Sequence, residues 1–249
     1  MPSATTTTIQ NSINWSAAFV VQRPTTGVAQ ITGEPAITTA NVIMQSIMGP
    51  PLTWPWNRTN AVAAFQTTQG ISDYTINLPT FGYLEKAVLV NPAAQGQEPP
   101  NQELEVYRVL GKDGKQNRPL NIAILLEDAN QNYTFRLFPV PDKIYTVDLT
   151  YQNQPIFIPQ GANLATTLWA PIPDKLSYLY QRGFLAQLQG MYNSQLYMAG
   201  MELFFRQLVA ANEGLTEAEK AIFLEDKLRQ LQTQAAALQT VQQGKQARG

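Results

Sequence analysis

Few residue types in this chain are suited to catalysis. Its 249 residues include no cysteine and no histidine. These absences exclude a thiolate nucleophile, a Ser-His-Asp triad, an HExxH zinc site and an imidazole proton shuttle. An enzyme built from this sequence would have to rely on carboxylates, as glycosidases do, and would need two of them that converge across a cleft.

The acidic and glycine-rich motifs do not supply such a site. Glu127 and Asp128 are adjacent, but neighbours on a strand point to opposite faces, so they are not expected to act as an acid/base couple. The run GKDGK at 111–115 lacks the GxxxxGK[ST] spacing of a phosphate loop, and its Asp-Gly pair favours a hairpin turn. We therefore expect no catalytic, cofactor or metal site, and no enzyme.

Aromatic residues offer two candidate binding surfaces. Trp54 and Trp56 are expected to be exposed because prolines surround them, and with Phe65 they could form a platform on which a sugar stacks. A second set could form an interaction face in the helical part of the chain: Tyr178, Tyr180, Phe184, Tyr192, Tyr197, Phe204 and Phe205. Packing in the core is the alternative for both sets.

The composition predicts a folded protein with a weakly charged surface. Hydrophobic residues make up 44% of the chain and charged residues 14%, whereas about 25% charged residues are usual in a soluble domain. The net charge of −1 argues against capture of nucleic acid or of an anionic membrane by charge. No apolar run approaches the length of a membrane span, and the N-terminus lacks the pattern of a signal peptide. A weakly charged surface favours lasting protein contacts.

The N-terminal part, residues 1–60, is expected to contain an arm and one helix. Residues 1–12 are small, polar and rich in threonine, which is typical of an extended arm that lies on a neighbour. The run INWSAAFVVQRP at 13–24 has strand-forming residues as far as its proline. A helix is predicted from Pro35 to Met48, because a proline suits the first turn and Gly-Pro-Pro follows the last.

The central part, residues 61–160, predicts an antiparallel β domain, either a meander or a sandwich. Seven short runs have strand character: 61–68, 73–79, 83–90, 103–110, 121–128, 132–138 and 144–151. The stretch 133–159 predicts a β-hairpin around a turn that contains Pro139 and Pro141. Asp113-Gly114 and residues 128–130 predict two further hairpin-like turns.

The C-terminal part, residues 161–249, is expected to form a helical bundle. Asp174 is the expected N-cap of two helices, or of one helix kinked near Gly190. A last helix begins at Thr216, which forms a capping box with Glu219. Its apolar stripe gives a candidate face for a partner helix, with packing on the preceding helices as the alternative. That face consists of Leu224, Leu228, Leu231 and Leu238.

Taken together, these segments predict an α+β fold. Three of them are informative as a set: the strand pair AFQTTQGISDYTINLP, the stretch NYTFRLFPVPDKIYTVDLTYQNQP and the loop LWAPIPDKLSYLYQRGFLAQL before the helical part. In these segments the chain resembles the head-to-tail adaptor proteins of tailed phages, which lie below the portal. GEPAITTANVIMQSIMGPPLTWPWNR is also similar to segments of phage virion proteins. The likeness covers residues 33–211, and the long N-terminal part departs from the pattern.

This resemblance implies a structural virion protein, assembled in the host cytoplasm, that forms a homo-oligomeric ring, a dodecamer in the family. The helical part would contact the portal protein, through residues 216–240 and the tail, and the β part would contact a tail or nozzle protein. Genomic DNA would pass through the ring as cargo, which a weakly charged channel suits. The resemblance implies no membrane partner. The alternative function is a β-rich adhesive or carbohydrate-binding virion module that uses Trp54 and Trp56.

Overall fold

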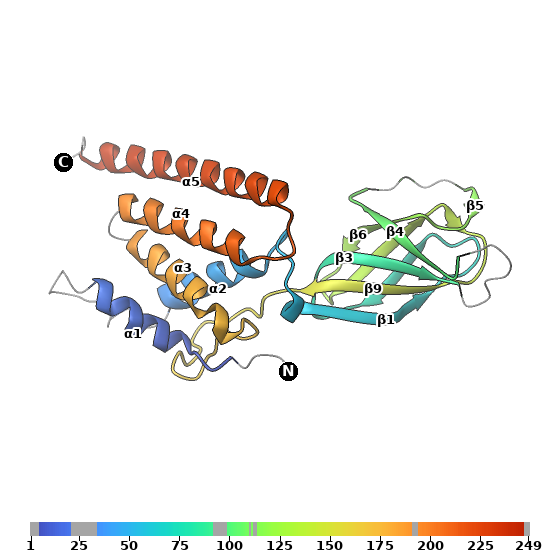
Figure 1. Ribbon diagram of the computed structural model, residues 1–249, viewed down its shortest axis with the longest axis horizontal. Helices are drawn as coiled ribbons and strands as arrows, with labels where there is room; N and C mark the ends of the chain where they lie inside the picture. The colour runs from blue at the N-terminus through green and yellow to red at the C-terminus, as the bar shows by residue number, and fades with distance from the viewer. Residues whose placement is uncertain are drawn as a thin grey trace. The chain divides into compact units, whose positions relative to one another are not determined.

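The computed structural model describes residues 5–20, 34–91, 99–109, 111, 114–190 and 194–246, with side chains as far as Gln234. The chain divides into two compact units (Figure 1). The helical unit combines Met1–Asn57 with Pro155–Gly249, and the β unit is the continuous stretch Arg58–Gln154. A largely antiparallel sheet and five α-helices in the described residues agree with the mixed α and β class expected from the sequence.

All five α-helices belong to the helical unit. They are α1 (Ile9–Val20), α2 (Glu34–Met48), α3 (Ser177–Gly190), α4 (Ser194–Ala211) and α5 (Glu217–Gln246). Two 3-10 turns, η2 (Pro55–Asn57) and η3 (Asp174–Leu176), lie next to them. Helices α1, α2 and α4 pack against α3, and α5 packs against α4 (Figure 1). The two ends of the chain therefore share one unit.

Helix α1 is the main difference from the sequence prediction. The strand expected at 13–24 is wrong as far as Val20, and residues 9–12, expected in an extended arm, are helical as well. Thr8 caps this helix, since its Oγ1 accepts a hydrogen bond from the Asn11 N–H at 3.1 Å. Ile9 and Ile13, four residues apart, are both buried on one helix face, and this burial outweighs the strand preference of the β-branched residues.

The predicted helix α2 and the predicted capping box of α5 are confirmed. Helix α2 begins one residue before Pro35 and ends at Met48 as expected, and the Gly49 N–H then donates to the Gln45 oxygen. The capping box of α5 is present: the Glu219 N–H donates to Thr216 Oγ1 at 3.3 Å and the Thr216 N–H donates to the Glu219 carboxylate at 2.8 Å. Separate helices α3 and α4 correspond to the two-helix alternative.

The core of the helical unit is centred on Trp169, which precedes α3. Its ring is fully buried and stacks on Tyr180 with centroids 4.6 Å apart. Its Nε1 donates a hydrogen bond to Ser12 Oγ of α1 at 2.9 Å. Gly183 of α3 lets α2 and α4 approach, because a Cβ there would lie only 2.8 Å from the Ile43 side chain.

The β unit is built on one seven-stranded sheet in the described residues, in the order β1-β9-β3-β4-β6-β7-β2. The strands are β1 (Arg58–Gln66), β2 (Asp73–Asn77), β3 (Phe81–Val90), β4 (Asn101–Tyr107), β6 (Asn121–Glu127), β7 (Asn132–Phe138) and β9 (Thr146–Asn153). The short strands β5 (Gln116–Asn117) and β8 (Val140–Pro141) form a separate pair. Each of the seven predicted runs overlaps one of the long strands.

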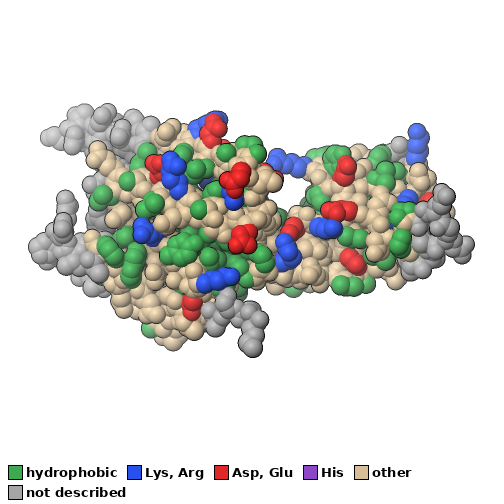
Figure 2. All heavy atoms as spheres, in the orientation of Figure 1, with side chains coloured by type: hydrophobic (Ala, Val, Ile, Leu, Met, Phe, Trp, Pro, Cys, Tyr) green, Lys and Arg blue, Asp and Glu red, His purple; other side chains and the backbone are tan. Residues whose placement is uncertain are grey.

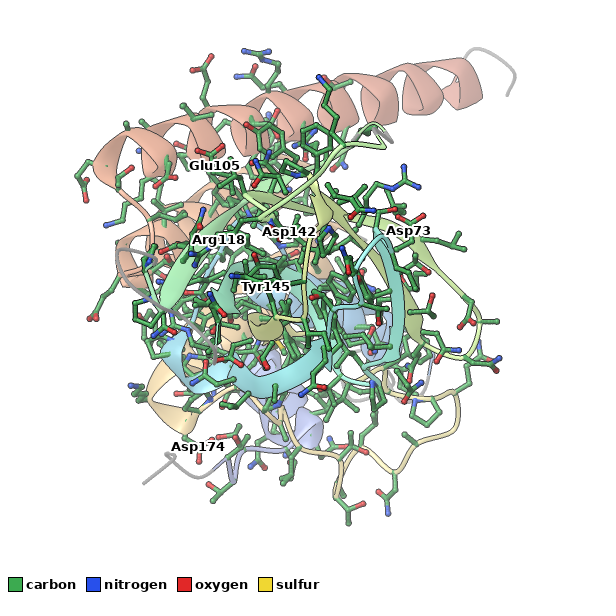
Figure 3. The ribbon with its side chains drawn as sticks, turned by 90° about the vertical axis from the view of Figure 1, so that its right-hand side faces the viewer. Asp73, Glu105, Arg118, Asp142, Tyr145 and Asp174 are labelled. Atoms are coloured by element: carbon green, nitrogen blue, oxygen red, sulfur yellow. The ribbon has the colours of Figure 1, made fainter. Side chains whose placement is uncertain are left out.

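The sheet curls until its two outer strands approach each other. Phe65 on β1 stacks on Tyr74 of β2 with ring centroids 4.9 Å apart, and it lies 6.1 Å from Phe135 of β7. Side chains fill the space inside the sheet when the β unit is viewed end-on (Figure 3). The sheet is therefore nearly closed around one apolar core.

Two of the predicted hairpins are wrong. Strand β7 pairs with β6 and β2, whereas β9 pairs with β1 and β3, so residues 133–159 do not form a hairpin. Alternation places one face of each strand inside the same core, and that pattern does not reveal which strands are neighbours.

The turn predicted at Asp113-Gly114 lies between β4 and β6. These two strands pair in parallel, so the segment that links them is not a hairpin; Asp113 itself lies outside the described residues. The turn at 128–130 is a hairpin turn as predicted.

Candidate functional site

The acidic pair Glu127 and Asp128 takes part in structural contacts. No group of three or more acidic, histidine or cysteine side chains that could hold a metal ion is found among the described residues. Glu127 accepts a hydrogen bond from the Tyr133 hydroxyl at 2.9 Å. Asp128 accepts hydrogen bonds from the backbone N–H groups of Asn130 and Asn132 and so holds the β6–β7 turn. These bonds explain both members of the acidic pair.

Trp54 is only 3% exposed, so the prediction that it is an exposed aromatic is wrong. The prolines that follow α2 turn the chain back over the end of that helix, and Trp54 Nε1 donates to the Ile47 oxygen at 2.7 Å. The ring centroids of Trp56 and Trp54 are 5.7 Å apart, and Trp56 is half-buried against the same core. Phe65 is in the core of the β unit. These three residues do not form an open platform for a sugar.

The second aromatic set follows the alternative of core packing. Tyr180, Phe184, Phe204 and Phe205 are buried in the helical unit. Tyr197 is partly buried against the same core, Tyr178 is partly exposed, and Tyr192 lies outside the described residues.

The leucine stripe of α5 also faces inward. Leu231 is 4% exposed, and Leu224 and Leu228 are partly buried against the core of the helical unit. Packing on the preceding helices therefore accounts for these three residues of the candidate partner-helix face. The side chain of Leu238 lies outside the described residues.

The described part of the N-terminal arm lies on its own unit. The N–H and Oγ1 of Thr6 donate to Asp174 Oδ2 at 2.8 and 2.6 Å, and those of Thr7 donate to Oδ1 at 3.1 and 2.9 Å. Asp174 begins η3, and its carboxylate holds the arm instead of capping a helix as predicted. Burial alone would raise the pKa of Asp174, but these hydrogen bonds outweigh it and lower the pKa from 3.8 to about 2. A bridge between Thr8 and Leu168 continues the attachment.

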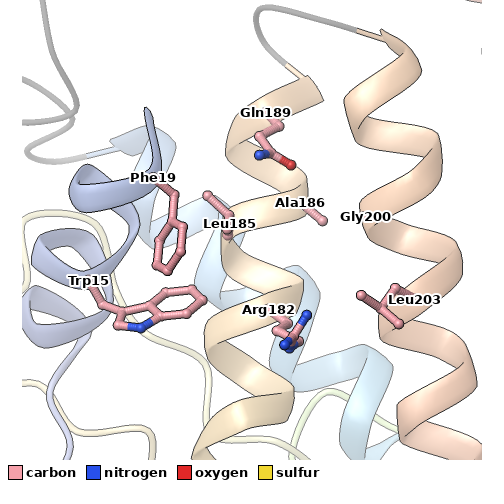
Figure 4. A pocket seen from close by; sticks show the side chains of 8 residues that line it. All are labelled: Trp15, Phe19, Arg182, Leu185, Ala186, Gln189, Gly200 and Leu203. Carbon is pink, nitrogen blue, oxygen red and sulfur yellow. The ribbon is translucent and has the colours of Figure 1, made fainter. Parts of the chain in front are cut away.

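An apolar groove on the helical unit is the strongest candidate functional site (Figure 4). It lies across α1, α3 and α4 and has a volume of about 240 Å³. Trp15 and Phe19 of α1 form one wall, with ring centroids 4.7 Å apart, and Leu185 and Leu203 belong to the lining as well. Phe19 is 58% exposed and Leu203 42% exposed, so a large apolar surface faces solvent here. Hydrophobic side chains are visible on this unit in Figure 2.

The floor of the groove forms where α3 and α4 approach closely. A Cβ on Gly200 would lie 2.8 Å from the Ala186 Cβ, so glycine is required at this position. Arg182 is the one charged residue of the lining, and Gln189 is its other long polar side chain. The groove is therefore suited to an apolar side chain with a negative charge beside it.

The groove is not among the predicted surfaces, because residues 13–24 are expected to form a strand. In a helix, Trp15 and Phe19 are four residues apart and share a face that does not contain Ile9 and Ile13. Two apolar faces on one short helix indicate a second contact in addition to the core. That signal is present in the sequence once the segment is treated as helical.

Four large apolar side chains of the β unit are also exposed. They are Val106 and Tyr107 of β4 and Leu125 and Leu126 of β6.

No protein-family model matches this sequence, and no curated protein matches it. Among the described helices, none is both long enough and apolar enough to cross a membrane.

Proposed function

We propose that this protein is a structural virion protein, a head-to-tail adaptor that forms a ring between the portal and the tail of a phage particle. Its role would be geometric rather than catalytic. The helical unit, as a C-terminal helical bundle joined by α1 and α2, would meet the portal, and the β unit, as a sandwich-like block, would meet a tail or nozzle protein. The genome would pass through the ring.

The observation that carries the proposal is the apolar groove of α1, α3 and α4 on a chain with 14% charged residues. A monomer that exposes Phe19, Leu203 and Trp15 together has apolar area that association would bury. Large permanent interfaces are depleted in charged residues at their centre, and the lining of this groove contains one charged residue, Arg182. The groove contains no group that would act on a substrate.

The adhesive or carbohydrate-binding function is the weaker alternative. It depends on exposed tryptophans, whereas Trp54 is buried and Trp56 is half-buried. No observation on the described residues favours it.

The proposal is tested by measuring the mass of the purified protein by mass photometry, alone and with a portal protein from a tailed phage that encodes this chain. We expect closed rings of one subunit number, formed either by the protein alone or on the portal. A protein that stays monomeric under both conditions would contradict the proposal. Glycan binding by such a monomer would then support the adhesive function.

A further inference from the structure

We infer that the groove of one copy binds the outer face of α5 of a second copy, with Ile222 inserted between α1 and α4. This inference rests on the proposed function, because it names the contact between neighbouring copies in the ring. It is carried by two surfaces of the helical unit whose polarity and charge complement each other.

The first surface is the groove, whose single charge is positive. Arg182 lies within the lining next to apolar side chains (Figure 4). It forms no ion pair with any residue that the structure describes. A guanidinium beside apolar side chains can bind a carboxylate in a fixed, two-pronged geometry. The groove thus accepts an apolar side chain and selects for acidic neighbours.

The second surface is the outer face of α5. Ile222 is 69% exposed, whereas the next residue, Phe223, and Leu231 on the opposite side of the helix are buried. Within about one turn of Ile222, on the same side, lie Glu219, Glu225 and Asp226; Arg229 lies two turns on. Three carboxylates against one guanidinium leave this face with a charge of −2.

These carboxylates keep acceptor capacity for a partner. Arg229 pairs with Glu225 at 2.9 Å within the helix. Asp226 accepts only an amide N–H from Gln230, at 2.9 Å, in the contacts of the described residues. A carboxylate has about four acceptor sites, so Asp226 can also take the Arg182 guanidinium of a second copy.

Charge also excludes the simplest alternative, in which two grooves face each other. That arrangement would bring two Arg182 side chains together in an apolar interface, where like charges repel strongly. Pairing a groove with the α5 face instead brings opposite charges together. The two copies use different surfaces, the groove of α1, α3 and α4 on one and α5 on the other, so the contact is head-to-tail and can close into a ring.

The decisive test uses the absence of cysteine from the chain, because every disulfide must then come from introduced residues. We would combine Leu203→Cys with Ile222→Cys and oxidise the assembled protein. We expect a ladder of covalent oligomers on a non-reducing gel for the double variant, and monomers for each single variant. The matched control is Leu196→Cys with Ile222→Cys, since Leu196 is also on α4 and 51% exposed but does not line the groove.

The outcomes separate this inference from the proposed function. A ladder from the double variant and not from the control supports the inference. Covalent dimers from Leu203→Cys alone would show grooves facing each other and would overturn it. Wild-type rings without a ladder from the double variant would overturn the inference and leave the proposed function standing. A wild-type protein that remains monomeric, with and without portal, would overturn both.

A mixing experiment gives an independent answer if oxidation disturbs the assembly. Leu203→Asp should prevent the groove from binding, and Ile222→Asp should prevent the outer face of α5 from binding. Both positions are exposed, so both variants should still fold. Each variant alone should be monomeric, whereas an equal mixture should form dimers and nothing larger.

Reversal of the charges tests the same contact. Arg182→Glu should weaken association about tenfold or more, and Asp226→Arg in the same chain should restore the association. Unchanged assembly of these variants would overturn the inference.

Discussion

The helical unit and the β unit differ in how the chain builds them. The β unit is one continuous stretch whose ends are adjacent, since Arg58 pairs with Gln152 and Thr59 Oγ1 bonds the Asn153 side chain at 2.9 Å. The helical unit joins two stretches that the whole β unit separates. Its cohesion therefore depends on contacts between residues more than a hundred positions apart, such as Ser12 with Trp169. We therefore expect the β unit to fold on its own, whereas the helical unit requires both chain ends.

The largest effect should come from removing one end. Deletion of residues 1–20 takes away Ile9, Ile13 and the Ser12 contact to Trp169, and we expect the helical unit to unfold. The β unit, expressed alone as Arg58–Gln154, should fold. Amide dispersion in NMR spectra distinguishes the two results. A folded helical unit without residues 1–20 would remove the contrast between the units.

A smaller but still large effect is expected from one core residue in each unit. Trp169→Ala and Phe135→Ala each remove a fully buried ring, at a cost of about 3 to 5 kcal/mol in the free energy of unfolding. All four tryptophans lie in the helical unit, so tryptophan fluorescence during urea unfolding reports that unit. Its midpoint should fall for Trp169→Ala and stay unchanged for Phe135→Ala. Equal shifts for both would show that the units unfold together.

The two units also differ in how far their sequences predict them. Every long strand of the β unit follows from alternation and turn residues, but the pairing of β9 with β1 and β3 does not. Alternation fixes which side chains point inward, whereas the choice of neighbouring strands depends on the long-range closure of the sheet. In the helical unit, caps and prolines locate α2 and α5, because these signals act within a few residues.

The candidate site was the least predictable part. Local composition suggested that prolines would expose Trp54, yet the fold of the chain over α2 buries it. The groove combines side chains from residue 15 to residue 203, so no local pattern contains it. Its one sequence signal, Trp15 and Phe19 at helical spacing, becomes visible only when the segment is treated as a helix. Surfaces assembled from distant helices require the tertiary structure.

A moderate loss of stability is expected when Asp174, which binds Thr6 and Thr7 of the N-terminal arm, is replaced. Asp174→Asn should lower the free energy of unfolding of the helical unit by about 1 to 2 kcal/mol near neutral pH, allowing for solvent screening. Because folding lowers the pKa of Asp174 from 3.8 to about 2, its contribution is complete above pH 4 and is lost as the pH falls from about 4 to 2. Urea midpoints of wild type and variant should therefore converge toward pH 2. A difference that is constant with pH would contradict this role.

The smallest effect in this series concerns the start of α5. Thr216→Ala removes the side chain that accepts the Glu219 N–H and should cost about 1 kcal/mol in the free energy of unfolding of the helical unit. Thr216→Ser keeps the hydroxyl and should cost much less, which makes it the matched control. Since Phe223 and Leu231 hold α5 on α4 by burial, the helix should remain docked, and tryptophan fluorescence should show a shifted midpoint with an unchanged slope. A changed slope would mean that α5 detaches before the rest of the unit unfolds, and the helical unit would then contain a separable part that the β unit lacks.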